Sequence, residues 1–257
     1  MSGPLRIAVV HPDLLGTYGD GGNGLILARR AGWRGHEVAL LQATSDGPLP
    51  EADIYCLGGG EDGPQVRAAR TLGEDGTLAR RVEAGAVVLA VCAGYQIVGR
   101  SFPDADGHPH AGLGLLPIST VKGTGARAVG EVVARTAEGG PSLPTLTGFE
   151  NHGGRTTLDE GAVPLARVTV GVGNGDGSGT EGAWAGRVVG TYLHGPVLAR
   201  NPALADLLLA WALGADEWAP LDDAAALDLR QERLDAVAGR GGFRDRNRRA
   251  GPPARTR

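Results

Sequence analysis

Short apolar runs alternate with amphipathic stretches over the first hundred residues. The runs are rich in branched side chains and too short for helices, so they predict buried strands at 5–10, 37–42, 52–60 and 86–91. Helical patterns cover 25–35 and 64–85, with a break expected near Gly73–Gly76, and another helix begins after residue 92. This alternation predicts an α/β fold with a central, mostly parallel sheet and helices on both faces.

The pattern changes after the first hundred residues. Few helical stretches occur between about 111 and 193, where short alternating segments predict strands and hairpins, and hence a β-rich second half. A further helix is predicted over 201–214, with Asn201 as its N-cap and Gly214 at its end. We take 1–214 as one domain.

The remainder of the chain predicts an extension and a tail. The segment 215–238 is interpreted as a helical extension, whose amphipathic pattern runs over 222–239. The segment 239–257 contains seven arginines and one aspartate among almost no apolar residues. It is expected to be disordered and solvated, with docking on anionic lipid or another polyanion as the alternative.

Composition limits the class of protein. The chain has 257 residues, a formal net charge of -4 and 2 cysteines, so neither general nucleic-acid binding nor a disulfide framework is indicated. The first apolar run is too short for a signal peptide or a membrane span. We therefore expect a cytoplasmic protein.

A cysteine stands where the strand 86–91 ends. Cys92 is followed by small residues and a helical pattern, as in a strand–nucleophile–helix elbow. Such a turn exposes the side chain, and the helix N-terminus favours a thiolate. Position alone leaves Cys92 open as either a nucleophile or a small buried residue. Cys56 lies within a predicted strand and is interpreted as structural.

A thiol nucleophile needs a base, and the chain offers 6 histidines. His194 follows the strand-like VVGTY, which should enter the same sheet as the strand before Cys92. His108 and His110 lie in a loop with aspartates. No third histidine or cysteine has ligand-like spacing to them, so no metal site is predicted.

Several segments occur in a fixed order along the chain: LGGGED, VLAVCAGYQIVG, GLGLLP, GFENHGGRT and VVGTYLHGPVLARNP. With them, residues 5–214 resemble class I (triad-type) glutamine amidotransferases of the cobyric-acid-synthase-like group. The segments YGDGGN, ENHGGRT and HGPVLARNP more narrowly resemble the glutaminase subunits of lipid II isoglutaminyl synthases. The resemblance implies a three-layer, flavodoxin-like fold.

The resemblance also implies roles for individual residues. Cys92 matches the nucleophile that attacks the glutamine carboxamide, and His194 matches the general acid and base that releases ammonia and leaves a glutamyl thioester. Arg127 matches the position that holds glutamine, where a guanidinium suits a carboxylate. The oxyanion would rest on backbone N–H groups of Ala93 and of Gly59 or Gly60.

One departure from the family pattern concerns the third member of the triad. Single-chain relatives place a glutamate two residues after the histidine, and here that position is Pro196. The acid would come from a partner subunit, as is thought for the isoglutaminyl synthase group. Alternatively it would come from within this chain, from Asp20 or Glu150.

No nucleotide site is expected in this chain, and no other cofactor. TYGDGGN lacks the G-K-[ST] ending of a phosphate loop, and Lys122 is the only lysine. ATP and Mg are therefore expected on a Mur-ligase-like partner in a heterodimer. By resemblance, that partner would amidate the D-glutamate of lipid II to D-isoglutamine, at the inner face of the membrane. The alternatives are another acceptor such as a corrin carboxylate, a DJ-1/PfpI-type cysteine hydrolase, and an inactive binding module.

Overall fold

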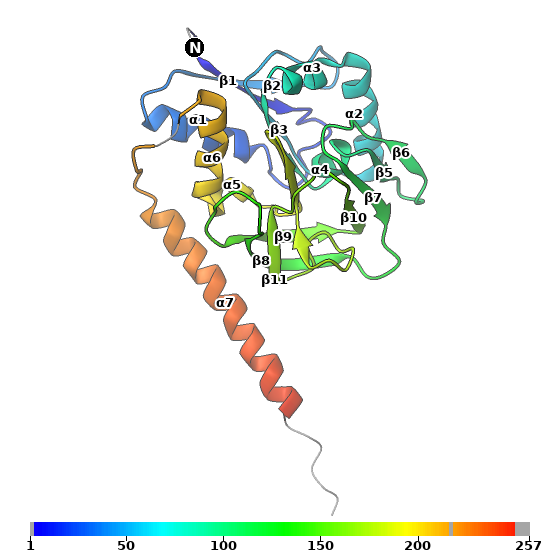
Figure 1. Cartoon of the computed structure of the whole chain (residues 1–257), viewed down its shortest axis with the longest axis vertical. Coiled ribbons are helices and arrows are strands. Elements are labelled where there is room, and N and C mark those ends of the chain that lie inside the picture. Colours follow the sequence, from blue (N-terminus) through cyan, green and yellow to red (C-terminus); the bar gives the residue numbers. More distant parts are fainter. Residues whose placement is uncertain (1–2, 216–217, 250–257) are drawn as a thin grey trace, which may run out of the picture.

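A six-stranded sheet lies at the centre of the molecule, in the order β13-β14-β4-β3-β1-β2 (Figure 1). The computed structural model describes residues 3–215 and 218–249. All neighbouring strands of this sheet pair in parallel except β13 and β14. The predicted parallel sheet is confirmed, with strands β1 (Leu5–Val10), β2 (Val38–Ala43), β3 (Ile54–Leu57), β4 (Val87–Val91), β13 (Ala183–Ala185) and β14 (Val188–Thr191).

Helices cover both faces of this sheet (Figure 1). One side carries α1 (Gly22–Trp33), which packs on α6 (Pro202–Leu213) and on the short α5 (Val197–Arg200). The other side carries α2 (Asp62–Asp75), α3 (Thr77–Glu83) and α4 (Ala93–Ile97). Every residue of β3 and β4 is consequently buried, which explains why these strands are continuous apolar runs without alternation.

Of two predictions about helix ends, one is confirmed and one is wrong. The expected break in the helix over 64–85 lies at Gly76, which adopts a left-handed φ of 65° and separates α2 from α3. Asn201 precedes α6 but does not cap it through its side chain. Its amide instead accepts from the Thr147 N–H at 3.0 Å and donates to the Thr147 carbonyl at 2.8 Å. Asn201 therefore ties α6 to β9 (Leu146–His152) rather than closing the helix end.

The second half is β-rich, as expected. One four-stranded sheet has the order β10-β7-β5-β6 and another the order β12-β11-β8-β9. Phe149 of β9 exchanges backbone hydrogen bonds with His194, so this half contacts the end of β14 directly. The strands, besides β9, are β5 (Ser101–Pro103), β6 (Pro109–Ala111), β7 (Ile118–Lys122), β8 (Ala128–Thr136), β10 (Gly154–Leu158), β11 (Ala166–Val170) and β12 (Thr180–Glu181).

The last helix, α7 (Ala224–Arg249), extends away from the body (Figure 1). Arg30 of α1 binds both Asp206 of α6 and Asp223, just before α7, and so anchors the extension. The sequence predicts that this helix ends at Gly239, but it continues to Arg249. Residues 250–257 of the expected disordered tail lie outside the described residues.

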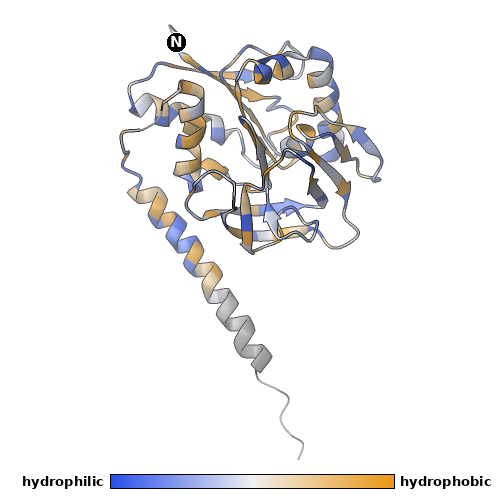
Figure 2. Ribbon diagram, viewed as in Figure 1, coloured by the Kyte–Doolittle hydropathy of each residue, from blue (hydrophilic) through white to orange (hydrophobic). Residues whose placement is uncertain are grey.

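The last two helices differ in the hydropathy of their residues. Figure 2 shows apolar residues along α6 and mixed polar and apolar residues along the first part of α7. No helix in the described part of the chain combines the length and the apolar character needed to span a bilayer.

Candidate active site

The carboxyl ends of four parallel strands meet at one edge of the central sheet. Cys92 follows β4, the glycines of LGGG follow β3, and the loop containing Asp20 follows β1. His194 comes three residues after the end of β14, which pairs in parallel with β4. Parallel sheets place their sites at this edge, and here the expected candidates gather from distant parts of the sequence.

Cys92 occupies a strained turn between β4 and α4. It has φ 52° and ψ −104°, and is one of two non-glycine residues with positive φ in the described chain. Such a conformation costs on the order of 1–3 kcal/mol and persists only where its surroundings impose it. The Cys92 N–H donates to the Thr191 carbonyl at 2.9 Å, and the Gly94 N–H donates to Gly58 at 3.1 Å. The strand–turn–helix elbow is thus present, and its side chain lines a pocket.

His194 contacts the Asp20 carboxylate and interacts with Cys92. Its Nδ1 lies 3.1 Å from Oδ2 of Asp20, and both side chains are almost fully buried. Nε2 makes no hydrogen bond within the described residues. Burial alone would lower the pKa of His194, but Asp20 and Cys92 outweigh it and raise the pKa to about 10. At neutral pH the ring is therefore an imidazolium, which stabilises a neighbouring thiolate.

The geometry separates the two in-chain candidates for the third acid. Asp20 contacts His194 directly, although 174 residues separate them in sequence. Glu150 instead accepts the N–H groups of Val172 at 2.8 Å and Gly173 at 2.9 Å, and its histidine neighbour is His152. Pro196 stands at the start of α5. Among these residues, Asp20 alone is placed to orient the base.

The two glycines expected in the oxyanion hole differ in what they contact. The Gly59 N–H donates to Oδ2 of Asp20 at 2.9 Å, so it is already engaged and is not free for an oxyanion. A Cβ added to Gly59 would lie 2.8 Å from Cε1 of His194, so glycine permits the close approach of the ring. Gly60 and Ala93 line the pocket beside Cys92 and keep their places as candidate donors.

Arg127 also lines this pocket, which has a volume of about 220 Å³. That volume is below the range of about 300–1,000 Å³ typical of drug-sized ligands, so the pocket suits a small metabolite. Arg127 donates from Nε to Oδ1 of Asn151 at 3.2 Å, and from Nη2 to the Asn151 carbonyl at 3.1 Å. The guanidinium is therefore held in place from one side while its other edge remains available to a carboxylate.

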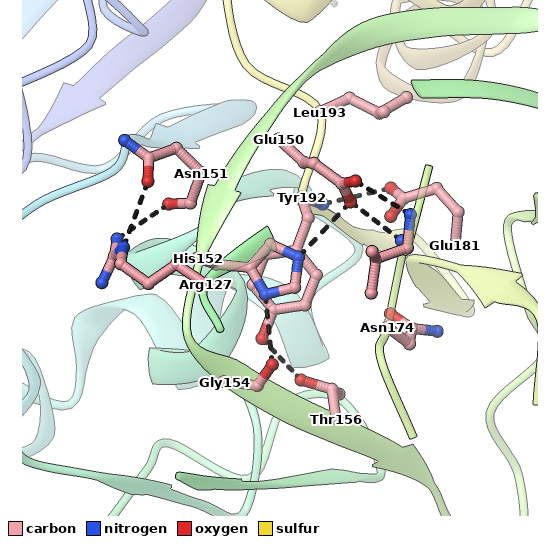
Figure 3. A network of polar contacts seen from close by, with 12 residues as sticks. Arg127, Glu150, Asn151, His152, Gly154, Thr156, Asn174, Glu181, Tyr192 and Leu193 are labelled. Carbon is pink, nitrogen blue, oxygen red and sulfur yellow. Dashed lines mark hydrogen bonds and ion pairs between the residues drawn. The ribbon is translucent and has the colours of Figure 1, made fainter. Parts of the chain in front are cut away.

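Several residues at the site carry no obvious signal in the sequence. Tyr18 packs its ring against that of His194, with centroids 4.6 Å apart. His152 and Gln96 also line the pocket. His152 stacks on Tyr192 with ring centroids 3.7 Å apart, and the Tyr192 hydroxyl contacts Thr156 (Figure 3) and Gln96. The ordered segments GFENHGGRT and VVGTYLHGP contain His152 and Tyr192, but nothing in their spacing indicates the stack.

Cys56, although buried like Cys92, does not line the pocket within the described residues. It lies inside β3, and burial raises the pKa of its thiol to about 12. A thiol in that state is not a nucleophile at neutral pH. Its position in the core matches the structural role expected for it.

The loop with aspartates and histidines brings Asp104, Asp106 and His108 together, with one ligand atom from each within 4.8 Å of the others. Oδ1 of Asp104 already accepts the N–H groups of Asp106 at 2.9 Å and His108 at 2.8 Å, which shapes the turn. These contacts account for the arrangement as loop structure. The donor set shows nothing that an ion must satisfy.

Comparison with known proteins identifies similar chains. A family model described as the CobB/CobQ-like glutamine amidotransferase domain matches residues 6–202. The "Lipid II isoglutaminyl synthase (glutamine-hydrolyzing) subunit GatD" of Staphylococcus aureus (strain N315) is 36% identical over 230 residues, covering 87% of this chain and 92% of the relative. The protein of the same name from Streptococcus pneumoniae (strain ATCC BAA-255 / R6) is 34% identical over 239 residues, covering 90% and 91%.

Other similarities are more distant. The cobyric acid synthase of Sphingopyxis alaskensis is 36% identical over 206 residues, which cover 74% of this chain but only 39% of that protein. Among solved structures, PurLQS from Thermotoga maritima superposes with a TM-score of 0.56 at 16% identity, covering 83% of this chain and 99% of that one. At this identity the likeness concerns the fold alone.

Proposed function

The chain belongs to the CobB/CobQ-like glutamine amidotransferase family, and from that premise we propose that it hydrolyses L-glutamine as the glutaminase subunit of a lipid II isoglutaminyl synthase. The observation that carries the proposal is the group Cys92, His194 and Asp20 at the strand-end pocket. Similarity to two glutamine-hydrolysing subunits over about nine-tenths of the chain favours this function over those of other members of the family.

The site's own residues suffice for the hydrolytic chemistry. The Cys92 thiolate attacks the side-chain carboxamide carbon of glutamine, and the negative charge moves onto the amide oxygen. The N–H groups of Ala93 and Gly60, which line the pocket, would stabilise that oxygen. The His194 imidazolium gives its proton to the departing nitrogen, which leaves as ammonia while a glutamyl thioester remains. His194, now neutral, then takes a proton from water, which attacks the thioester and releases glutamate.

Asp20 supports this cycle without reacting. It accepts a hydrogen bond from Nδ1 of His194, which leaves Nε2 to face Cys92 and the substrate. A carboxylate in this position fixes the ring orientation and stabilises the imidazolium form. Arg127 would hold the α-carboxylate of glutamine in the pocket.

A second subunit is needed for the complete reaction. An amide forms only after the acceptor carboxylate is activated, and we assign ATP and Mg to a Mur-ligase-like partner rather than to this chain. Ammonia made at Cys92 would pass to that partner, which would convert the D-glutamate of lipid II to D-isoglutamine. Because lipid II is membrane-bound, we place the complex at the cytoplasmic face of the membrane.

The test is glutamine hydrolysis by the full chain, alone and with the co-purified partner. Wild type should release glutamate in at least one of these states, and Cys92→Ala should lose the activity. Cys56→Ala is the matched control and should retain it. Supplying lipid II and ATP should then yield the amidated product. Glutaminase activity that survives in Cys92→Ala would falsify the mechanism, and amidation of a corrin acceptor but not lipid II would overturn the acceptor.

A further inference from the structure

A continuous series of contacts joins Arg127 to His194 along residues that line the pocket. Arg127 donates to Asn151 twice, through Nε and Nη2. Nδ2 of Asn151 in turn donates to the Tyr18 hydroxyl at 3.2 Å. The Tyr18 ring rests on the His194 ring, with the two planes inclined by 50°. Arg127, Asn151 and Tyr18 all line the pocket that contains Cys92.

These contacts connect two parts of the molecule that the chain builds separately. Arg127 immediately precedes β8, and Asn151 lies on β9, where it pairs with Val129 of β8. Tyr18 belongs to the loop after β1, two residues before Asp20. The Asn151–Tyr18 hydrogen bond thus links the peripheral β8–β9 sheet to the catalytic edge of the central sheet.

We propose that Asn151 and Tyr18 are positioning residues that fix the distance between Arg127 and the Cys92–His194 pair, and so select glutamine over the shorter asparagine. The inference rests on the proposed glutaminase function. Arg127 is exposed, and a free arginine side chain samples many rotamers. Asn151 removes that freedom by holding the guanidinium at two points.

A fixed distance is what discriminates between the two amides. If Arg127 holds the α-carboxylate, a side chain shorter by one methylene stops about 1 Å or more short of the sulfur. Misplacement by about 1 Å can cost about 10²-fold in rate. If Arg127 could move inward, the site would lose that discrimination.

The test compares variants in the complete complex with its partner, using L-glutamine and L-asparagine as substrates. Asn151→Ala should raise the glutamine KM by about tenfold with a smaller change in kcat, and should lower the glutamine-to-asparagine ratio of kcat/KM. Tyr18→Phe keeps the ring on His194 and removes only the hydroxyl. It should change the same quantities in the same direction by a few-fold. Thr124→Ala, in the exposed loop before Arg127, is the matched control.

A double-mutant cycle distinguishes positioning from a general loss of structure. If Asn151 acts through Arg127, the Arg127→Ala/Asn151→Ala pair should have the same KM as Arg127→Ala alone. Unchanged KM and selectivity in Asn151→Ala, or effects that add fully in the double variant, would overturn the inference. Loss of activity in Cys92→Ala together with either of those results would leave the glutaminase proposal standing and remove only this one.

Discussion

Two buried carboxylate–histidine pairs lie near each other in this molecule, and only one is arranged for catalysis. In the first, Asp20 holds Nδ1 of His194, and Nε2 has no hydrogen-bond partner within the described residues. In the second, His152 has Nδ1 at 3.1 Å from the Gly154 carbonyl. Its Nε2 lies 3.6 Å from a Glu150 carboxylate oxygen, within ion-pair distance, and likewise has no hydrogen-bond partner within the described residues (Figure 3). Tyr192 covers one face of the second ring.

The comparison shows that residue types do not define a catalytic pair. Both pairs are buried; His152 ends β9 and His194 follows β14, and the two segments are joined by backbone hydrogen bonds between Phe149 and His194. What differs is whether the second ring nitrogen is left facing a nucleophile. Nε2 of His152 faces the Glu150 carboxylate, whereas the His194 ring interacts with the Cys92 thiol, to which it can pass a proton.

The largest expected difference between the pairs is in rate. His194→Gln should lower kcat for glutamine hydrolysis by about 10²–10⁴-fold, because it removes the general acid and base. His152→Gln keeps the size and polarity of the side chain and should leave kcat within a few-fold. Its cost should instead be about 1–3 kcal/mol of unfolding free energy, from the lost stack and hydrogen bond. Steady-state kinetics measures kcat, and urea denaturation measures the free energy of unfolding, for both variants. Equal losses of kcat in the two variants would contradict the proposed difference between the two pairs.

A second difference is that the free energy of unfolding should depend on pH through Glu181, a buried carboxyl next to Tyr192, the residue that stacks on His152. Glu181 lies behind Tyr192, whose N–H it accepts at 3.1 Å. Burial, together with the nearby Glu150 charge, outweighs the hydrogen bonds from Thr191 and Tyr192 and raises the pKa of Glu181 from 4.5 to about 7. The folded state therefore binds this proton more tightly than the unfolded state. Its stabilising contribution is complete below about pH 4.5 and is lost as the pH rises to about 7.

Glu181→Gln should remove this dependence. Between pH 4.5 and 8, wild type should lose about 3 kcal/mol more unfolding free energy than the variant. Urea denaturation of both proteins across this range measures the difference. Parallel pH curves for the two proteins would show that the carboxyl does not titrate as inferred.

A third, smaller effect separates the two carboxylates. Asp20→Asn should lower kcat by less than the loss of His194 does, since the base remains but the imidazolium loses its partner. Because Asp20 raises the pKa of His194, its removal should also shift the alkaline limb of the rate profile to lower pH. Glu150→Gln should leave both the rate and the limb in place and lower only stability. An unshifted limb in Asp20→Asn would point to an acid supplied by the partner subunit.

The smallest expected effect comes from the close approach of Gly59 to the His194 ring. Gly59→Ala should lower kcat by about tenfold, because its Cβ would displace the ring from its place. Gly63→Ala is the matched control, since an added Cβ there meets nothing within 4 Å. It should leave kcat unchanged and slightly stabilise α2. A Gly59→Ala enzyme with wild-type kcat would show that the ring tolerates the shift.

Sequence patterns were sufficient for the frame of the site. Buried apolar runs predicted that Cys92 and His194 each follow a strand of the same sheet, and the structure shows that these strands are adjacent and parallel. The patterns could not choose between Asp20 and Glu150, because both are single acids in loops or strands far along the chain from His194. They also missed Tyr18 and Asn151, whose roles depend on contacts between two sheets rather than on periodicity.

The ends of helices were harder to predict from the sequence than the presence of the helices. Gly239 suggested a helix end, yet α7 continues to Arg249, because a glycine within a helix costs only about 1 kcal/mol. Asn201 has the identity of a cap, but its amide finds stronger partners in the backbone of β9. Gly59 and Gly60 are adjacent and chemically identical, and only the structure shows which N–H is engaged.

The contrast between the chain's two thiols also provides a built-in way to count working enzyme. Cys56 is buried with its pKa raised to about 12, while Cys92 opens onto the pocket. An alkylating amide analogue should therefore label each competent chain once, and mass spectrometry should find the adduct at Cys92 alone. Active-site concentration in any preparation can be titrated directly, without removing the other cysteine by mutation.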